Sequence, residues 1–186
     1  MQIDRVMQCL ECNPIIAAVQ RDSLQKAIDS PTEIIFHLGA DLMSIPEIVD
    51  RVHGSGKMIF LHLDLAEGLG KDKTAVQYLA QCGVDGIIST KAQLIRYAKE
   101  FDLVTVQRFF ALDSKGLDSI EEMCKNTNPH LMEIMPGVIG KAIRRFSSGN
   151  IPVIAGGLIQ TKAEVTDALG CGATAVSTGK TDLWYL

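Results

Sequence analysis

The chain has 186 residues, of which 47% are hydrophobic and 22% are charged, and its formal net charge is −4. This length and this composition predict one globular domain with a sizeable core. The negative net charge excludes a strong general attraction to nucleic acid or anionic lipid. Because the start of the chain lacks a signal-peptide core and no apolar run could span a bilayer, we expect a cytoplasmic protein with no membrane partner.

Five cysteines are spread along the chain. In the absence of an export signal we expect them to be reduced thiols. Cys9 and Cys12 form a C-x-x-C pair, but no second pair and no histidine follow at the spacing of a zinc site. We therefore expect the cysteines to pack in the structure and to bind no metal.

The first half of the chain alternates between short apolar runs and segments of helical spacing. Residues 1–13 have weak helical character and are expected to cap one end of the fold. Four strands are predicted after them, over residues 15–20, 33–38, 57–65 and 85–90. In the segment after each strand, apolar residues recur every three or four positions, so a helix is predicted there.

Four more strands are predicted in the second half, over residues 103–109, 129–135, 151–155 and 173–176. Helical segments separate them, but only a stub, residues 181–186, follows the last one. Eight strand–helix units at intervals of roughly 20–25 residues indicate a parallel sheet. We therefore predict an α/β fold of one domain over residues 1–186, a minimal TIM-type (β/α)8 barrel with a curtailed last helix. An open doubly wound sheet is the alternative.

Small residues follow the last two predicted strands. Gly156 and Gly157 follow one of them, and Ser177, Thr178 and Gly179 follow the other. In (β/α)8 barrels these loops commonly bind phosphate. Glycine lets backbone N–H groups approach phosphate oxygens, and a helix N-terminus adds partial positive charge. The five residues are therefore predicted to form an anion site, unless Gly156-Gly157 is only a tight turn.

The third predicted strand places Phe60, His62 and Asp64 on one face. That face would line the barrel, with Asp64 at its mouth. An imidazole and a carboxylate on one face could act as general acid and base, hold a metal, or bind ligand hydroxyls. Because no third ligand occurs at a recognisable spacing, we expect no metal here.

Three more charged residues lie near the ends of strands. Lys91 stands just past residues 85–90, Arg108 lies near the end of residues 103–109, and Glu133 shares a face with Leu131. A buried charge without a partner is costly, so Arg108 and Glu133 are expected to pair across the barrel.

One segment is basic. Between residues 134 and 163 there are four basic residues and no acidic one. Three of them, Lys141, Arg144 and Arg145, are spaced to share one face of a helix. This face is the only candidate surface for a polyanion.

Several stretches resemble a single family. They are MIFLHLDL at residues 58–65 with Gly68-Leu69, GIISTK at 86–91, VQRFFALD at 106–113, MEIMPGVIGK at 132–141 and IPVIAGGLIQTKAE at 151–164. In this order they resemble the bacterial glycerol-uptake-operon antiterminator regulatory proteins, which respond to glycerol 3-phosphate. The resemblance covers the chain from about residue 14 to residue 184.

The resemblance implies a TIM-type barrel that binds sn-glycerol 3-phosphate as its effector and uses no cofactor. The liganded protein would bind the leader of a glycerol-catabolism messenger RNA and prevent premature termination of transcription. The phosphate would fall to Gly156, Gly157, Ser177, Thr178 and Gly179. The glycerol end or the barrel mouth would fall to His62, Asp64, Arg108 and Glu133, with Lys91 in a place where some relatives have arginine.

RNA binding has weaker support in the sequence, because the chain lacks an aromatic platform and a recognised RNA motif. It would have to use the Lys141, Arg144 and Arg145 face, a dimer of the chain, or a ligand-induced change. Two other functions remain open. One is a phosphosugar or triose-phosphate isomerase, epimerase or aldolase-like enzyme with Asp64 or Glu133 as its base. The other is a binding module that has lost its RNA role.

Overall fold

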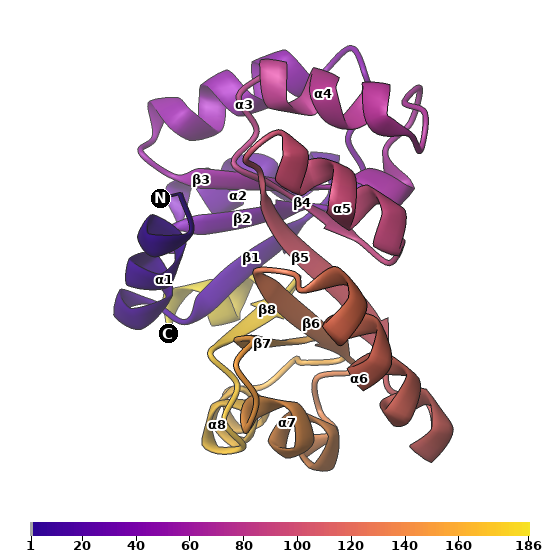
Figure 1. Ribbon diagram of the computed structural model, residues 1–186. Coiled ribbons are helices and arrows are strands. Elements are labelled where there is room, and N and C mark those ends of the chain that lie inside the picture. The colour runs from indigo at the N-terminus through magenta and orange to yellow at the C-terminus, as the bar shows by residue number, and fades with distance from the viewer. Residues whose placement is uncertain (1) are drawn as a thin grey trace.

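The strands of the chain close into a barrel. The computed structural model describes residues 2–186, in which every strand runs parallel to its neighbours in chain order and β8 pairs with β1 (Figure 1). The strands are β1 Ile15–Val19, β2 Ile34–His37, β3 Met58–His62, β4 Gly86–Ser89, β5 Val104–Phe110, β6 Leu131–Met135, β7 Val153–Gly156 and β8 Ala175–Thr178. The predicted TIM-type barrel is therefore confirmed, and the open doubly wound sheet is wrong.

Helices follow the strands and cover the outside of the barrel. The α-helices are α1 Gln2–Cys12, α2 Leu24–Asp29, α3 Ile45–Gly54, α4 Lys73–Gln81, α5 Ala92–Glu100, α6 Ser114–Thr127, α7 Gly140–Ser147 and α8 Lys162–Gly170, and the 3-10 turns are η1 Arg21–Ser23, η2 Leu63–Leu65 and η3 Thr181–Tyr185. The helices bury their apolar stripes on the outward side chains of the strands, as Val49 and Val52 of α3 do in the cluster that contains Ile59. Within residues 2–186, no helix combines the length and the apolar character that a membrane span requires.

Alternate side chains of the strands fill the interior. The interior cluster contains Ile16, Ile34, Phe36, Met58, Phe60, Ile88, Val104, Val106, Leu131, Ile154 and Ala175. Val6 and Leu10 of α1 are buried against the same cluster. Helix α1 lies beside the amino-terminal ends of the strands (Figure 1), so it closes that end of the barrel. Helix α1 thus lies within residues 1–13, the segment for which a cap was predicted.

The third strand is shorter than predicted. Strand β3 ends at His62, and Leu63–Leu65 forms the 3-10 turn η2 instead of continuing the strand. The Nζ of Lys71 donates to the carbonyl oxygens of Leu63 and Ala66 at 2.5 and 2.7 Å, which satisfies backbone acceptors that the sheet leaves free. Consequently Phe60 and His62 keep the predicted inward face, while Asp64 lies in the turn η2 and outside the strand.

The last strand starts later than predicted. Gly172 adopts a φ of +98°, and β8 begins only at Ala175, so Ser177 and Thr178 lie inside the strand. The short turn η3 replaces an eighth outer helix, as predicted. Its Trp184 is fully buried and donates from Nε1 to the carbonyl oxygen of Thr178 at 2.8 Å, which anchors the stub to the end of β8.

Candidate functional site

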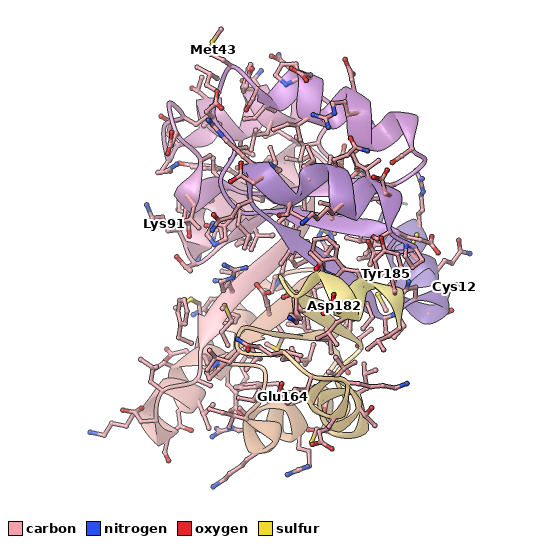
Figure 2. The ribbon with its side chains drawn as sticks, turned by 180° about the vertical axis from the view of Figure 1, so that it is seen from behind. Cys12, Met43, Lys91, Glu164, Asp182 and Tyr185 are labelled. Carbon is pink, nitrogen blue, oxygen red and sulfur yellow. The ribbon has the colours of Figure 1, made fainter. Side chains whose placement is uncertain are left out.

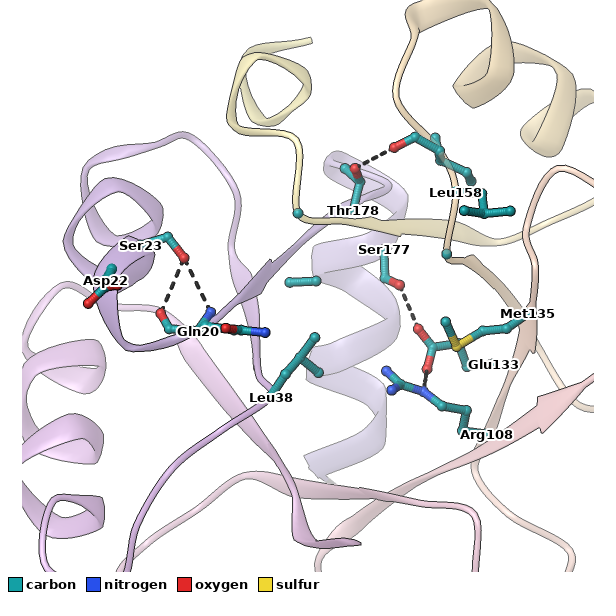
Figure 3. A pocket seen from close by; sticks show the side chains of 14 residues that line it. Gln20, Asp22, Ser23, Leu38, Arg108, Glu133, Met135, Leu158, Ser177 and Thr178 are labelled. Carbon is teal, nitrogen blue, oxygen red and sulfur yellow. Dashed lines mark hydrogen bonds and ion pairs between the residues drawn. The ribbon is translucent and has the colours of Figure 1, made fainter. Parts of the chain in front are cut away.

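A pocket of about 480 Å³ opens at the carboxyl-terminal end of the barrel. It is lined by Ala18, Gln20, Asp22, Ser23, Leu38, Arg108, Glu133, Met135, Gly157, Leu158, Ile159, Ser177, Thr178 and Gly179. These residues come from the ends of β1, β2, β5, β6, β7 and β8 and from the loops that follow them. Figure 3 shows Gln20, Asp22 and Ser23 on one side, and Leu158, Thr178, Ser177 and Glu133 on the other.

The floor of this pocket is a chain of polar contacts between three strands. Glu133 of β6 accepts from the Nε of Arg108 at 2.6 Å and from the Oγ of Ser177 at 2.5 Å (Figure 3). Glu133 is 0% exposed and Arg108 is 8% exposed. The predicted pairing of Arg108 with Glu133 is therefore present, with Ser177 satisfying the second carboxylate oxygen. Within the described residues, the terminal nitrogens of Arg108 make no hydrogen bond, and the Arg108 side chain lines the pocket.

Gly156 supports this floor without lining the pocket. A Cβ at residue 156 would lie 2.3 Å from Oε1 of Glu133 and 2.7 Å from Oγ of Ser177. Any larger residue would therefore displace the contact between Glu133 and Ser177. Residue 156 therefore has to be glycine, because the Glu133 side chain fills the space that a Cβ would need.

The rim of the pocket has the backbone geometry of an anion cradle. Gly157 and Leu158 have φ angles of +76° and +62°, so two successive residues are left-handed. Among the described loop hydrogen bonds, none is donated by the N–H of Gly157, Leu158 or Gly179. These N–H groups can therefore bind an anion, and the side chain of Leu158 lies 66% exposed at the mouth.

Two other groups near the rim are already occupied. The Oγ1 of Thr178 donates to the carbonyl oxygen of Ile159 at 2.8 Å and accepts from the N–H of Lys180 at 3.1 Å. The start of α8 is capped by its own residues, because Thr161 and Glu164 exchange side-chain and backbone hydrogen bonds. The Thr178 hydroxyl is therefore already engaged in the fold, whereas the N–H groups of the Gly157-Leu158 loop have no partner in the described loops.

His62 lies inside the barrel below the mouth. It is 4% exposed, and its Nδ1 has no hydrogen-bond partner among the described residues. Burial lowers the pKa of His62 to about 4, and the nearby Arg108 guanidinium adds to this effect. At neutral pH the imidazole is therefore uncharged. His62 does not line the pocket, although it is close enough to Arg108 for their charges to interact.

Asp64 and Lys91 lie outside the pocket. Asp64 accepts from Oγ of Ser89 at 2.6 Å and from both N and Oγ1 of Thr90 at 2.7 Å. Burial alone raises the pKa of the Asp64 carboxyl, but these hydrogen bonds lower it more, so the pKa lies below its ordinary value. Lys91 precedes α5 and is exposed, as Figure 2 shows. The structure thus separates these two residues from Arg108 and Glu133.

Several lining residues were absent from the prediction, namely Gln20, Asp22, Ser23, Leu38, Met135 and Leu158. Gln20 to Ser23 directly follow β1, so the rule that ligands bind at the carboxyl ends of strands could have found them. No pattern in the sequence marks Leu158, because its left-handed backbone appears only in the folded loop.

The basic face on α7 meets acidic residues from the neighbouring helix. Arg145 donates to Asp118 and Glu121 of α6 at 2.6 and 2.7 Å. Arg144 donates to the Sγ of Cys171 at 2.7 Å, and Lys141 is exposed. The segment that lacks acidic residues in the sequence is therefore partly neutralised in three dimensions. Among residues 2–186, no three His, Cys, Asp or Glu side chains are grouped so that they could hold a metal ion.

The chain matches the family model for the glycerol-3-phosphate responsive antiterminators over residues 15–184. It is 35% identical over 184 residues to YgcP, an uncharacterised protein of Escherichia coli (strain K12), with 97% of this chain and 96% of that protein covered. It is also similar to the solved glycerol uptake operon antiterminator regulatory protein of Listeria monocytogenes, at 31% identity and a TM-score of 0.88, with 92% and 95% of the two chains covered.

A second solved relative is the glycerol uptake operon antiterminator-related protein of Thermotoga maritima. It has 31% identity and a TM-score of 0.83, with 91% of this chain and 96% of that chain covered. More distant solved structures include a deoxyribose phosphate aldolase from Aeropyrum pernix, at 14% identity and a TM-score of 0.70, which shows the fold alone. On the family match and these relatives, the chain belongs to the glycerol-3-phosphate responsive antiterminator family.

Proposed function

We propose that the protein senses sn-glycerol 3-phosphate in the pocket above Arg108 and Glu133. In its liganded form it binds the leader of a glycerol-catabolism messenger RNA and prevents premature termination. The proposal that the protein binds this ligand is supported by one observation. A single pocket combines the unpaired N–H groups of Gly157 and Leu158 with a polar floor. The RNA half rests on membership of the family.

The pocket suits a small phosphate ester. Backbone N–H groups of successive left-handed residues bind oxyanions without adding a formal charge. Deeper in the pocket, the free nitrogens of Arg108 can donate to the hydroxyls of a short polyol. The pocket therefore has a rim that can bind a phosphate group and a floor that can bind the hydroxyl groups of the same ligand.

The competing proposal, an isomerase, epimerase or aldolase-like enzyme, has less support. Both oxygens of Glu133 accept hydrogen bonds, from Arg108 and Ser177, so this carboxylate is already engaged in the floor of the pocket. Asp64 is held by Ser89 and Thr90 and does not line the pocket. A search for turnover of phosphorylated trioses and sugars checks this: release of any altered product at a catalytic rate would support the enzyme.

Thermal unfolding with sn-glycerol 3-phosphate tests the ligand half. A ligand that binds only the folded state stabilises it by about 2.7 kcal/mol at a hundredfold excess over Kd. We expect a rise in Tm with the phosphoester, and no comparable rise with glycerol or inorganic phosphate at the same concentration. A Tm that does not change with millimolar phosphoester would contradict the proposal.

Leader-RNA binding tests the other half and the surface involved. The expected result is an affinity that rises when sn-glycerol 3-phosphate is present, because a ligand promotes RNA binding only by preferring the competent state. If the face formed by Lys141, Arg144 and Arg145 contacts the RNA, reversing the three charges should lower the salt slope by about 2. The matched control reverses Arg5, Lys26 and Arg96, three exposed cations on α1, α2 and α5. Equal effects of both sets would remove the α7 face from the proposal.

A further inference from the structure

We propose that Glu133 and Asp22 make the pocket selective for phosphate esters whose other groups are neutral hydroxyls, and that they exclude esters that also carry a carboxylate. This inference rests on the proposed function, because it assumes that the pocket binds a phosphate ester. It adds the chemical class that the pocket accepts and the residues that set it.

The first step is the charge of the pocket lining. Among the described lining residues there is one cation, Arg108, and there are two carboxylates, Asp22 and Glu133. Arg108 is already paired with Glu133 through a contact of 2.6 Å between Nε and Oε2. The lining therefore has no unpaired cation with which to neutralise a second anionic group.

The second step is that one anionic group is tolerated. The N–H groups at Gly157 and Leu158 carry partial positive charge, and no described loop hydrogen bond uses either of them. A phosphate placed there is stabilised by the dipoles of these N–H groups and does not need to pair with Arg108. The rest of the ligand then lies between this rim, the floor at Glu133, and Asp22 at the mouth (Figure 3).

The third step concerns what the remaining space can bind. A hydroxyl can accept from the free nitrogens of Arg108 and donate to Asp22 or to the amide oxygen of Gln20. A carboxylate can only accept, and its charge would repel those of Glu133 and Asp22. Glu133 is fully buried, and both of its oxygens are held by Arg108 and Ser177, so it cannot move away to reduce the repulsion. Discrimination then comes from a repulsive element built into the site.

Isothermal titration with two ligands of the same length tests this. sn-Glycerol 3-phosphate and L-3-phosphoglycerate have the same configuration at the central carbon and differ in one position, where a hydroxymethyl group is replaced by a carboxylate. We expect the wild-type protein to bind the alcohol at least about a hundredfold more tightly than the acid. Glu133→Gln keeps the shape of the side chain, with an amide oxygen that can still accept from Arg108 and an amide nitrogen that can donate to Ser177. It should reduce this ratio at least about tenfold. Asp22→Asn, at an exposed and better screened position, should reduce it about threefold.

Two controls separate charge from structure. Ser177→Ala removes the hydrogen bond to Glu133 without changing the charge, so it should weaken both ligands alike and leave the ratio unchanged. Asp113→Asn removes a carboxylate outside the pocket while keeping a residue that can cap α6. If Glu133→Gln does not fold, the exposed Asp22→Asn variant still reports the effect of charge on the ratio.

The outcomes are distinct. Equal affinity of the wild-type protein for the two ligands overturns the selectivity and leaves the proposed function standing. A large wild-type ratio that survives both Glu133→Gln and Asp22→Asn overturns the assignment to these carboxylates. If neither ligand binds at millimolar concentration, the proposed function fails and the selectivity falls with it.

Discussion

The two sides of the barrel mouth use similar polar residues for different purposes. Above β5, β6 and β8, Arg108, Glu133 and Ser177 contact one another at the floor of a pocket. Above β3 and β4, Asp64 is bound by Ser89 and Thr90, outside the pocket. Both sides present buried or half-buried polar groups at strand ends. On the first side, the terminal nitrogens of Arg108 remain free to meet a ligand in the pocket.

The difference lies in what each polar group already holds. Asp64 accepts three hydrogen bonds that join the turn after β3 to the end of β4. Its carboxylate oxygens therefore stabilise the fold. On the other side the terminal nitrogens of Arg108 are free within the described residues. A charged residue at the end of a barrel strand is therefore a better candidate for ligand binding when some of its hydrogen-bonding capacity is unused.

The largest expected effect comes from filling the space under the pocket. Gly156→Ala would place a Cβ 2.3 Å from Oε1 of Glu133. Overpacking of this kind costs about 1–3 kcal/mol, and here it displaces the floor of the pocket. We expect the affinity for sn-glycerol 3-phosphate, measured by titration calorimetry, to fall at least about a hundredfold.

The control for this variant is Gly170→Ala at the end of α8, where a Cβ would meet nothing within 4 Å. Its affinity should equal that of the wild-type protein. Should Gly156→Ala bind the phosphoester as tightly as Gly170→Ala does, the pocket floor would have no part in ligand binding.

The second largest effect is expected for Asp64, on the side of the mouth above β3 and β4. It should lower the stability of the fold and leave ligand affinity nearly unchanged. Asp64→Ala leaves the Thr90 N–H and the Ser89 hydroxyl without their acceptor. We expect the free energy of unfolding, from urea denaturation, to fall by about 2 kcal/mol. The affinity for sn-glycerol 3-phosphate should change less than about threefold, because Asp64 does not line the pocket. A large loss of affinity with unchanged stability would place Asp64 at the ligand.

The third effect is a dependence of stability on pH that arises from two buried histidines. Burial lowers the pKa of both His37 and His62 to about 4, below the ordinary value of 6.5. Between these values the unfolded chain binds more protons than the folded chain, so stability is complete above pH 6.5 and is lost as the pH falls towards 4. Each histidine should lower the free energy of unfolding by about 1–2 kcal/mol between pH 7 and pH 5.

Urea denaturation at several pH values measures this slope. His62→Gln should have a shallower slope than the wild-type protein, because one of the two groups no longer titrates. The comparison uses the slope within each protein, so a constant loss of stability in the variant does not affect it. An unchanged slope would mean that His62 does not contribute to the acid sensitivity.

The smallest effect is expected at Lys91. Its side chain is exposed (Figure 2). Lys91 is also absent from the residues that line the pocket. Lys91→Ala should change the free energy of unfolding by less than about 0.5 kcal/mol. It should also change the affinity for sn-glycerol 3-phosphate less than about threefold, since a distant exposed charge is screened by salt. A tenfold weaker affinity at physiological salt would instead make Lys91 part of the site.

Much of the site could be predicted because strand ends are visible in the sequence. The apolar runs before Arg108 and Gly156 placed these residues at the carboxyl ends of their strands, and parallel strands present those ends at one edge. The pairing of Arg108 with Glu133 followed from the cost of burying a charge. The predicted end of the third strand was wrong, because the sequence does not show that β3 stops at His62 and turns.

The sequence by itself determined the eight-stranded barrel, the short last unit and the family, since hydrophobic periodicity and local motifs are properties of neighbouring residues. The tertiary structure alone decided which polar groups remain free. Hydrogen bonds between residues far apart in the chain, such as Asp64 with Thr90, Arg145 with Asp118 and Glu133 with Ser177, use up that capacity. Such bonds depend on distances of a few ångströms that only the folded barrel sets.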